Sequence, residues 1–186
     1  MKTILLATDY SKAAANALKY AIELAEFTKA KLVLFHAYDI PVPVAEVPVV
    51  IPVAMSELKE ENEKAIKNLE TKILKQTAGK IIVESFIGCG MPVNEILKAL
   101  RKKKADVVIM GMKGAGKISE RIIGSTATFL MKKTKVPVLV IPLKSKFSRA
   151  HKIVLAYDYQ KTIGREVLKN IREFARLFKA EVEVLN

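Results

Sequence analysis

The chain has 186 residues, of which 51% are hydrophobic and 27% are charged, and its formal net charge is +13. This composition is typical of a soluble globular protein and excludes a disordered or fibrous one. The single cysteine, Cys89, excludes an internal disulfide and a cysteine-rich metal site, and two histidines are too few for a histidine cluster. No apolar run approaches the roughly 20 residues of a membrane helix, so we expect a cytoplasmic protein without a membrane partner.

The first elements along the chain are a strand, a turn and a helix. Lys2 to Thr8 is a short apolar run rich in β-forming residues, and apolar residues then recur at helical spacing from Ala14 to Ala25. Ser11 is expected to cap this helix, because its hydroxyl can accept a hydrogen bond from a free amide of the first turn. Further strands are predicted at 31–37, 81–87, 107–110 and 136–141, with helices at 57–77, 91–103 and 119–133.

The order of these elements predicts the fold class. Strands and helices alternate, which indicates an α/β fold with an open parallel five-stranded sheet and helices on both faces, Rossmann-like in architecture. Ligands of such sheets bind outside the carboxyl ends of the strands. The segment 40–55 interrupts the alternation with four prolines, so we expect a long apolar loop there, whose role the sequence does not indicate.

The end of the chain repeats its beginning. His151-Lys-Ile-Val-Leu-Ala-Tyr-Asp-Tyr matches Lys2-Thr-Ile-Leu-Leu-Ala-Thr-Asp-Tyr, and residues 175–186 then resemble 25–36. We therefore expect one domain at 1–146, followed at 147–186 by the strand, helix and strand that begin a second, incomplete copy. A truncated tandem protein and a tail completed by a partner chain both fit this pattern.

A glycine-rich segment follows the strand predicted at 107–110. Gly111, Gly114 and Gly124 are followed by Ser125 and Thr126 at the head of a helix. Glycines let the backbone approach phosphate oxygens, and a helix N-terminus offers free amides and the positive end of its dipole to an anion. The segment therefore predicts a phosphate site. Glycines that only turn the loop between strand and helix are the structural alternative.

A P-loop is the competing interpretation of the same glycines. The stretch from Gly111 to Lys117 fits the body of that motif, but Ile118 stands where a P-loop has the Ser or Thr that holds Mg²⁺. A second set of residues favours a sheet-edge site instead, because Asp9, Ala37 and Gly111 each close a predicted strand. Residues at the carboxyl ends of parallel strands converge on one crevice.

Five segments resemble the universal stress protein family in order and spacing, and the resemblance covers roughly residues 1–143. They are Ala7-Thr-Asp-Tyr-Ser, Phe35-His-Ala, Gly90-Met-Pro, Gly111 to Thr126 and Val136-Pro-Val-Leu-Val. The glycine spacing is similar to that of the ATP-binding members of the family. The resemblance implies the adenine nucleotide alpha hydrolase-like fold, with ATP, ADP or AMP as ligand and Mg²⁺ arriving with the nucleotide.

The resemblance also implies which residues bind that nucleotide. The ribose and adenine would be held by Asp9 and the backbone of Ala37, and Ala7 and Thr8 would also belong to the nucleotide site. The phosphates would be held by Gly111, Gly114, Gly124, Ser125 and Thr126. The pocket would also be lined by Met110 and Lys113. Family members pair through their last strand, so a homodimer through Val136–Ile141 is expected.

Three functions are compatible with these observations. An ATP-binding regulatory or stress-response protein is favoured, because no histidine or carboxylate pair accompanies the glycines to activate water. A slow Mg²⁺-dependent ATPase or phosphotransferase that uses Asp9 is the enzymatic alternative. The third is a nucleic-acid-binding protein, which would use the basic region 98–135. No aromatic residues interleave the lysines of 101–104 and 132–135, so bases would lack a stacking platform there.

Overall fold

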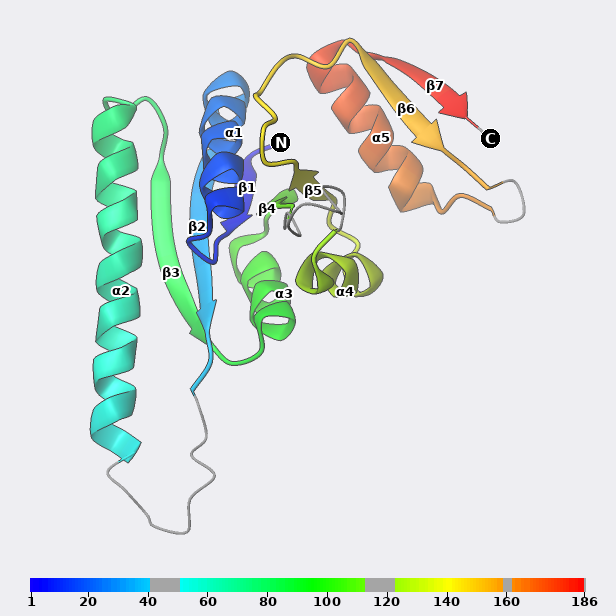
Figure 1. Cartoon of the computed structure of the whole chain (residues 1–186). Coiled ribbons are helices and arrows are strands. Elements are labelled where there is room, and N and C mark those ends of the chain that lie inside the picture. The colour runs from blue at the N-terminus through cyan, green and yellow to red at the C-terminus, as the bar shows by residue number, and fades with distance from the viewer. Residues whose placement is uncertain (41–50, 113–122, 159–161, 186) are drawn as a thin grey trace. The chain divides into compact units, whose positions relative to one another are not determined.

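The structure of the chain is a computed structural model that describes residues 1–40, 51–112, 123–158 and 162–185, with residues 51–54 described by their backbone only. The chain forms two compact units, Met1–Ser145 and Lys146–Asn186. Both units are drawn in Figure 1. Among the described residues, no helix combines the length and apolar character that a membrane span requires.

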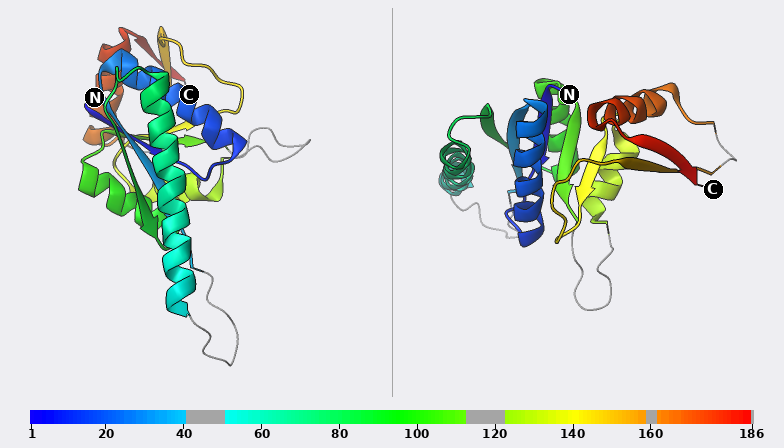
Figure 2. Two further views of the ribbon diagram at one scale, coloured as in Figure 1. Left: turned by 90° about the vertical axis from the view of Figure 1, so that its left-hand side faces the viewer. Right: turned by 90° about the horizontal axis from the view of Figure 1, so that it is seen from above.

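The first unit is built on a five-stranded parallel sheet in the order β3-β2-β1-β4-β5. This confirms the predicted α/β architecture. Its strands are β1 (Thr3–Ala7), β2 (Lys31–Tyr38), β3 (Val83–Cys89), β4 (Val107–Gly111) and β5 (Val138–Ile141). Its helices are α1 (Lys12–Thr28), α2 (Ile51–Gln76), α3 (Pro92–Lys103) and α4 (Ser125–Lys133). Helices α1 and α2 cover one face of the sheet, and α3 and α4 cover the other (Figure 2).

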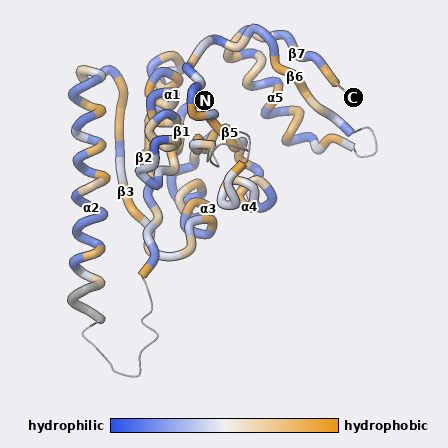
Figure 3. Tube along the Cα trace, viewed as in Figure 1, coloured by the Kyte–Doolittle hydropathy of each residue, from blue (hydrophilic) through white to orange (hydrophobic). Residues whose placement is uncertain are grey.

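The core lies along the three central strands. Every residue of Ile4–Leu6, Leu32–Leu34 and Val107–Ile109 is completely buried, because successive side chains point to opposite faces and both faces carry helices. Figure 3 shows hydrophobic residues gathered on these strands, whereas the outer helix α2 alternates hydrophilic and hydrophobic residues. The strands are therefore fixed firmly in register, and with them the residues that follow their carboxyl ends.

Helix boundaries agree with the predictions where a cap is present and differ elsewhere. Ser11 caps α1 as expected, with its hydroxyl oxygen 3.2 Å from the amide nitrogen of Ala14. Helix α2 begins at Ile51 and not at 57, because Pro52 occupies the first turn, where a missing amide costs no hydrogen bond. The predicted loop 40–55 was therefore too long at its end, and residues 41–50 lie outside the described structure.

Two further boundaries were predicted wrongly. Helix α4 begins at Ser125 and not at 119, because Gly124 adopts a non-helical cap conformation. Residues 119–122 lie outside the described structure. The third strand runs from Val83 to Cys89 and not from 81 to 87, because its pairing with β2 continues to Tyr38.

The last turns of α3 and α4 account for part of the basic region. Arg101, Lys102 and Lys103 end α3, and Lys132 and Lys133 end α4. Cations stabilise the C-terminal end of a helix, where the dipole is negative. These charges therefore lie where they stabilise their helices.

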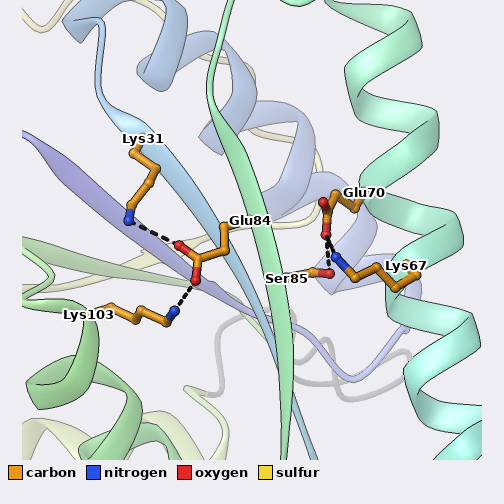
Figure 4. Close-up of polar contacts among 6 residues, drawn as sticks. All are labelled: Lys31, Lys67, Glu70, Glu84, Ser85 and Lys103. Atoms are coloured by element: carbon orange, nitrogen blue, oxygen red, sulfur yellow. Dashed lines mark hydrogen bonds and ion pairs between the residues drawn. The ribbon is translucent and has the colours of Figure 1, made fainter.

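Glu84 in β3 connects three elements of the first unit, as Figure 4 shows. Its carboxylate lies 3.0 Å from the ammonium nitrogen of Lys31 in β2 and also pairs with Lys103 in α3. The Lys103 side chain is only 18% exposed and its ammonium lies 4.9 Å from the centre of the Phe86 ring. This network therefore ties the edge strand to α3. In the same view, Glu70 of α2 accepts a hydrogen bond from Ser85.

Replacing Glu84 by alanine is expected to destabilise the first unit by about 1–2 kcal/mol, between the values for exposed and buried ion pairs. The cost arises because Lys103 would remain largely buried without its partner. Urea denaturation measures this change. Glu60→Ala is the matched control, since it removes an exposed pair with Lys64 in α2 and should leave the midpoint unchanged. Equal effects of the two substitutions would contradict the assignment.

The second unit consists of β6 (Lys152–Ala156), α5 (Arg165–Phe178) and β7 (Glu181–Leu185). Its two strands are parallel, and Lys152 pairs with Glu181 as Thr3 pairs with Lys31 in the first unit. Helices α1 and α5 are each followed by a C-cap lysine in the left-handed conformation, Lys29 and Lys179. The strand register of β1 and β2 and the C-terminal end of α1 are thus reproduced, whereas α5 begins at Arg165, later than the position equivalent to Lys12.

Candidate functional site

A cavity of about 510 Å³ opens at the carboxyl ends of the strands in the first unit. It lies where β1 and β4 are neighbours, and their crossover helices α1 and α4 lie on opposite faces of the sheet. Such a switch point is where open α/β sheets bind ligands, and the volume suits a small organic ligand. The cavity is therefore the candidate site.

The structure brings together nine of the eleven residues predicted for the site. The cavity is lined by Ala7, Thr8, Asp9, Ala37, Met110, Gly111, Gly124, Ser125 and Thr126. The other two, Lys113 and Gly114, lie outside the described residues. Three segments that are far apart in the sequence thus meet at one edge of the sheet.

Asp9 is held in a tight turn between β1 and α1. The amide of Ser11 donates to Asp9 Oδ1 at 3.0 Å, and the amide of Tyr10 donates to the Thr8 hydroxyl at 3.1 Å. Tyr10 has a φ of 59°, which allows the chain to reverse into α1. Partial burial raises the pKa of Asp9, but hydrogen bonds from Ser11 and the charge of His36 outweigh it and leave the pKa below its ordinary value. Asp9 is therefore a carboxylate at neutral pH.

His36 supports this turn from the neighbouring strand. Its Nδ1 lies 2.7 Å from the carbonyl oxygen of Thr8, and since a carbonyl only accepts, Nδ1 must donate. The ring also packs on Tyr10, with 4.6 Å between the ring centres. His36 is not among the residues that line the cavity. It positions the turn that carries Asp9.

The N-terminus of α4 faces the cavity without a side-chain cap. Gly124 is the cap residue and has no side chain that could accept a hydrogen bond from the first turn, which contains no acidic residue. The first amides of a helix have no acceptor within the helix, and they lie at the positive end of the dipole. Ser125 and Thr126 add hydroxyl donors beside them. This end of the cavity is suited to an anion such as a phosphate.

Gly111 is a glycine because α1 lies directly against it. A Cβ at this position would be 2.4 Å from the carbonyl carbon of Ala13 and 2.7 Å from the amide nitrogen of Ala14. These are backbone atoms of the first turn of α1, which cannot yield as a flexible side chain does. Gly111 therefore lets α1 pack directly against β4, and it lines the cavity at this contact.

Part of the cavity lining is apolar. It is formed by Phe35, Ile96, Met110 and Ala127, which belong to the core between the sheet and helices α3 and α4. On the far side, Asn16 donates to the carbonyls of Pro142 and Ser145 at 2.9 and 3.0 Å. These bonds fix the segment that carries Leu143 to the rim of the cavity. The lining can thus hold a flat apolar group as well as a negative charge.

Sequence reasoning missed part of the lining. The additional residues are Ser11, Lys12, Ala13, Ala14, Phe35, Pro92, Ile96, Ala127 and Leu143. Four of them, Ser11 to Ala14, form the N-cap and first residues of α1. Gly111 could have indicated them in the sequence, because a glycine that ends a buried strand indicates close approach of another backbone. Among the described residues, no group of three His, Cys, Asp or Glu side chains could hold a metal ion.

Comparison with known proteins places the chain in a family. The model of the "Universal stress protein family" matches residues 1–142. Universal stress protein MJ0531 of Methanocaldococcus jannaschii is 31% identical over 147 residues, which cover 78% of this chain and 84% of that protein.

Solved structures show the same fold. A universal stress protein from Archaeoglobus fulgidus aligns with a TM-score of 0.73 at 21% identity, covering 98% of this chain and 65% of its own. A family protein from Arabidopsis thaliana, solved with AMP bound, aligns with a TM-score of 0.50 at 18% identity, covering 76% of this chain and 91% of its own. The family model matches most of this chain and the sheet has the family's fold, so the chain belongs to the universal stress protein family.

Proposed function

We propose that the chain binds an adenine nucleotide, with ATP as the principal ligand, in the cavity between β1 and β4. One observation carries this proposal: the same cavity presents an ionised carboxylate, an uncapped helix N-terminus and an apolar wall. These are the complements of a sugar hydroxyl, a phosphate and a purine ring. The proposal assigns the cavity a role as a nucleotide-dependent switch in regulation or stress response.

Each part of the nucleotide has a chemically matched counterpart in the cavity. Asp9 would accept hydrogen bonds from the ribose hydroxyls, since an ionised carboxylate only accepts. The backbone at Ala37 and the side chain of Met110 would contact the adenine. The amides and hydroxyls of Ser125 and Thr126 would bind the phosphates, and Mg²⁺ would enter with them. The parts assigned to Lys113 and Gly114 rest on the family resemblance alone.

Two further considerations support binding as the principal activity. The Arabidopsis protein with this fold holds AMP, which is the same class of ligand. Rapid phosphoryl transfer needs metal clamps and a positioned nucleophile, whereas Asp9 is the one acidic group among the described lining residues. Slow Mg²⁺-dependent hydrolysis is the alternative activity of the same cavity, and steady phosphate release abolished by Asp9→Asn would favour it.

Replacing Asp9 by asparagine is expected to lower the affinity for ATP about tenfold, the loss of a hydrogen bond to a charged group. Asparagine keeps an oxygen acceptor for the Ser11 amide, so the turn should persist and the melting temperature should stay within error. Calorimetric titration with ATP measures the change in affinity.

Asp39→Asn is the matched control for this substitution. Asp39 is also exposed, follows the end of β2 and accepts a backbone hydrogen bond, from Ile40 at 2.9 Å, but it does not line the cavity. Its replacement should leave ATP affinity unchanged. If Asp9→Asn bound ATP as tightly as this control, the role proposed for the carboxylate would be wrong.

We further propose that the chain forms a homodimer through Val136–Ile141. This segment contains β5, an edge strand of the five-stranded sheet, and within the described parts of the chain β5 pairs only with β4. An exposed strand edge is a template for pairing with another chain. Sedimentation velocity should give a dimer, and a monomer at all accessible concentrations would exclude it.

Residues 147–186 are proposed to be the beginning of a second copy of the same domain. Three observations support this proposal: the repeated sequence, the matching register of β6 and β7, and the matching C-terminal end of α5. In α5 none of the side chains is buried, and Val154, Val182 and Leu185 are about half exposed. In the first unit, the equivalent side chains lie in the core. A covering layer supplied by further chain or by a partner would bury them.

A further inference from the structure

We infer that Lys12 is an additional phosphate contact of the cavity and makes it prefer nucleoside di- and triphosphates to monophosphates. The inference rests on the nucleotide site proposed above and adds a determinant of its selectivity. It concerns a residue that the glycine motif and the sheet edge did not indicate.

Lys12 is placed at the end of α1 that faces the cavity. It is the first residue of this helix, its side chain is exposed, and it lines the same cavity as Ser125 at the start of α4. Side chains of a helix lean toward its N-terminus. Lys12 and the N-terminus of α4 therefore line the same cavity from two different helices.

The charge of Lys12 is unfavourable for the helix that carries it. The N-terminus of a helix is the positive end of its dipole, where acidic residues are stabilising and basic ones are not. The first turn of α1 contains no acidic residue, and the described residues provide no ion-pair partner for Lys12. Asp9, three residues earlier, is engaged by the Ser11 amide. A residue that opposes the electrostatic preference of its own helix, without a compensating contact, is typical of a functional site.

The same lysine recurs in the second copy of the sequence. Asp9-Tyr10-Ser11-Lys12 corresponds to Asp158-Tyr159-Gln160-Lys161. The capping serine has been replaced there, whereas the aspartate, tyrosine and lysine are the same. Lys161 lies outside the described residues, so this is an observation on the sequence alone. It favours a role for the lysine that is linked to the aspartate and not to helix capping.

A lysine at this position discriminates between ligands by their negative charge. The adenosine part of the ligand gains nothing from an ammonium group, whereas each added phosphate brings further negative charge into the cavity. An ammonium group makes charge-assisted hydrogen bonds to phosphate oxygens, which are stronger than neutral ones. Lys12 should therefore strengthen binding in the order adenosine, AMP, ADP, ATP.

The experiment is calorimetric titration of the full chain with ATP, ADP, AMP and adenosine, for the wild type, Lys12→Gln and Lys12→Arg. In Lys12→Gln, we expect ATP affinity to fall about tenfold and AMP affinity to fall less than about twofold, the loss of one charged hydrogen bond. The salt dependence of ATP binding should weaken in the same variant. Lys12→Arg should restore most of the preference for ATP.

Lys19→Gln is the matched control, because Lys19 is exposed on the same helix but does not line the cavity. It removes the same charge and should leave all four affinities unchanged. Lys113 and Lys117 are present in every variant, so a changed ratio reports on Lys12 alone. The melting temperature of Lys12→Gln should be unchanged or raised, which separates a ligand contact from a role in folding.

Two results would overturn the inference. An unchanged ratio of ATP to AMP affinity in Lys12→Gln would exclude Lys12 as a selectivity determinant while leaving the nucleotide site intact. A wild-type chain that binds none of the four ligands would overturn the proposed function, and this inference with it.

Discussion

Replacing Gly111 by alanine is expected to destabilise the first unit by about 3 kcal/mol, the upper part of the range for overpacking a core. The new Cβ would lie 2.4 to 2.7 Å from backbone atoms of Ala13 and Ala14. The first turn of α1 would have to move away from β4, and Asp9, Ser11 and Lys12 would move with it. Nucleotide binding should therefore be lost together with stability. Urea denaturation and titration with ATP measure the two effects.

Gly164→Ala is the control for this substitution. Gly164 precedes α5, and a Cβ added there meets no atom within 4 Å. Its midpoint of denaturation should stay close to that of the wild type, because the only cost is the weaker preference of alanine for a helix cap. If Gly111→Ala were as stable as Gly164→Ala, close packing of α1 on β4 would not be the reason for a glycine at position 111.

Replacing Ser125 by aspartate is expected to lower ATP affinity about a hundredfold or more, because like charges brought together in a binding site cost several kcal/mol. Ser125 is the first residue of α4, at the end proposed to bind phosphates. A carboxylate there would occupy the anion site and repel the ligand. The fold should not suffer, since an acidic residue at a helix N-terminus is stabilising by about 0.3–1 kcal/mol. Binding and stability are thus expected to change in opposite directions.

Thr71→Asp is the matched control for Ser125→Asp. It adds the same negative charge at an exposed position of α2, outside the cavity lining. Titration of this variant should give wild-type affinity for ATP. Comparable losses in the two variants would mean that net charge, and not the anion site at α4, governs binding. A Ser125→Asp protein that kept its affinity would remove phosphates from this end of the cavity.

The fold could be predicted from the sequence because its signals are local. Buried parallel strands are continuous apolar runs, and the runs ending at Ala7 and Gly111 were recognised without any knowledge of their neighbours. The bounds of β3 were predicted wrongly, because they depend on its pairing with β2, which continues to Tyr38. The start of α2 was missed since a proline usually excludes a helix, whereas Pro52 falls in the first turn, where it is tolerated.

Part of the candidate site could also be predicted from the sequence. Residues that close strands, such as Asp9 and Ala37, must meet at one edge of a parallel sheet. The wall formed by Ile96 and Ala127 was not predictable, because apolar helix residues look alike in the sequence whether they face a cavity or the core. Lys12 was missed because a lysine at a helix start resembles any exposed lysine until the position of the cavity is known.

The most direct test of the nucleotide site is calorimetric titration of the full chain with Mg-ATP, after any nucleotide carried through purification has been removed. We expect saturable binding in the micromolar range, with Ser125→Asp showing none under the same conditions. Wild-type protein that is folded and free of nucleotide, yet binds neither ATP, ADP nor AMP, would contradict the central claim.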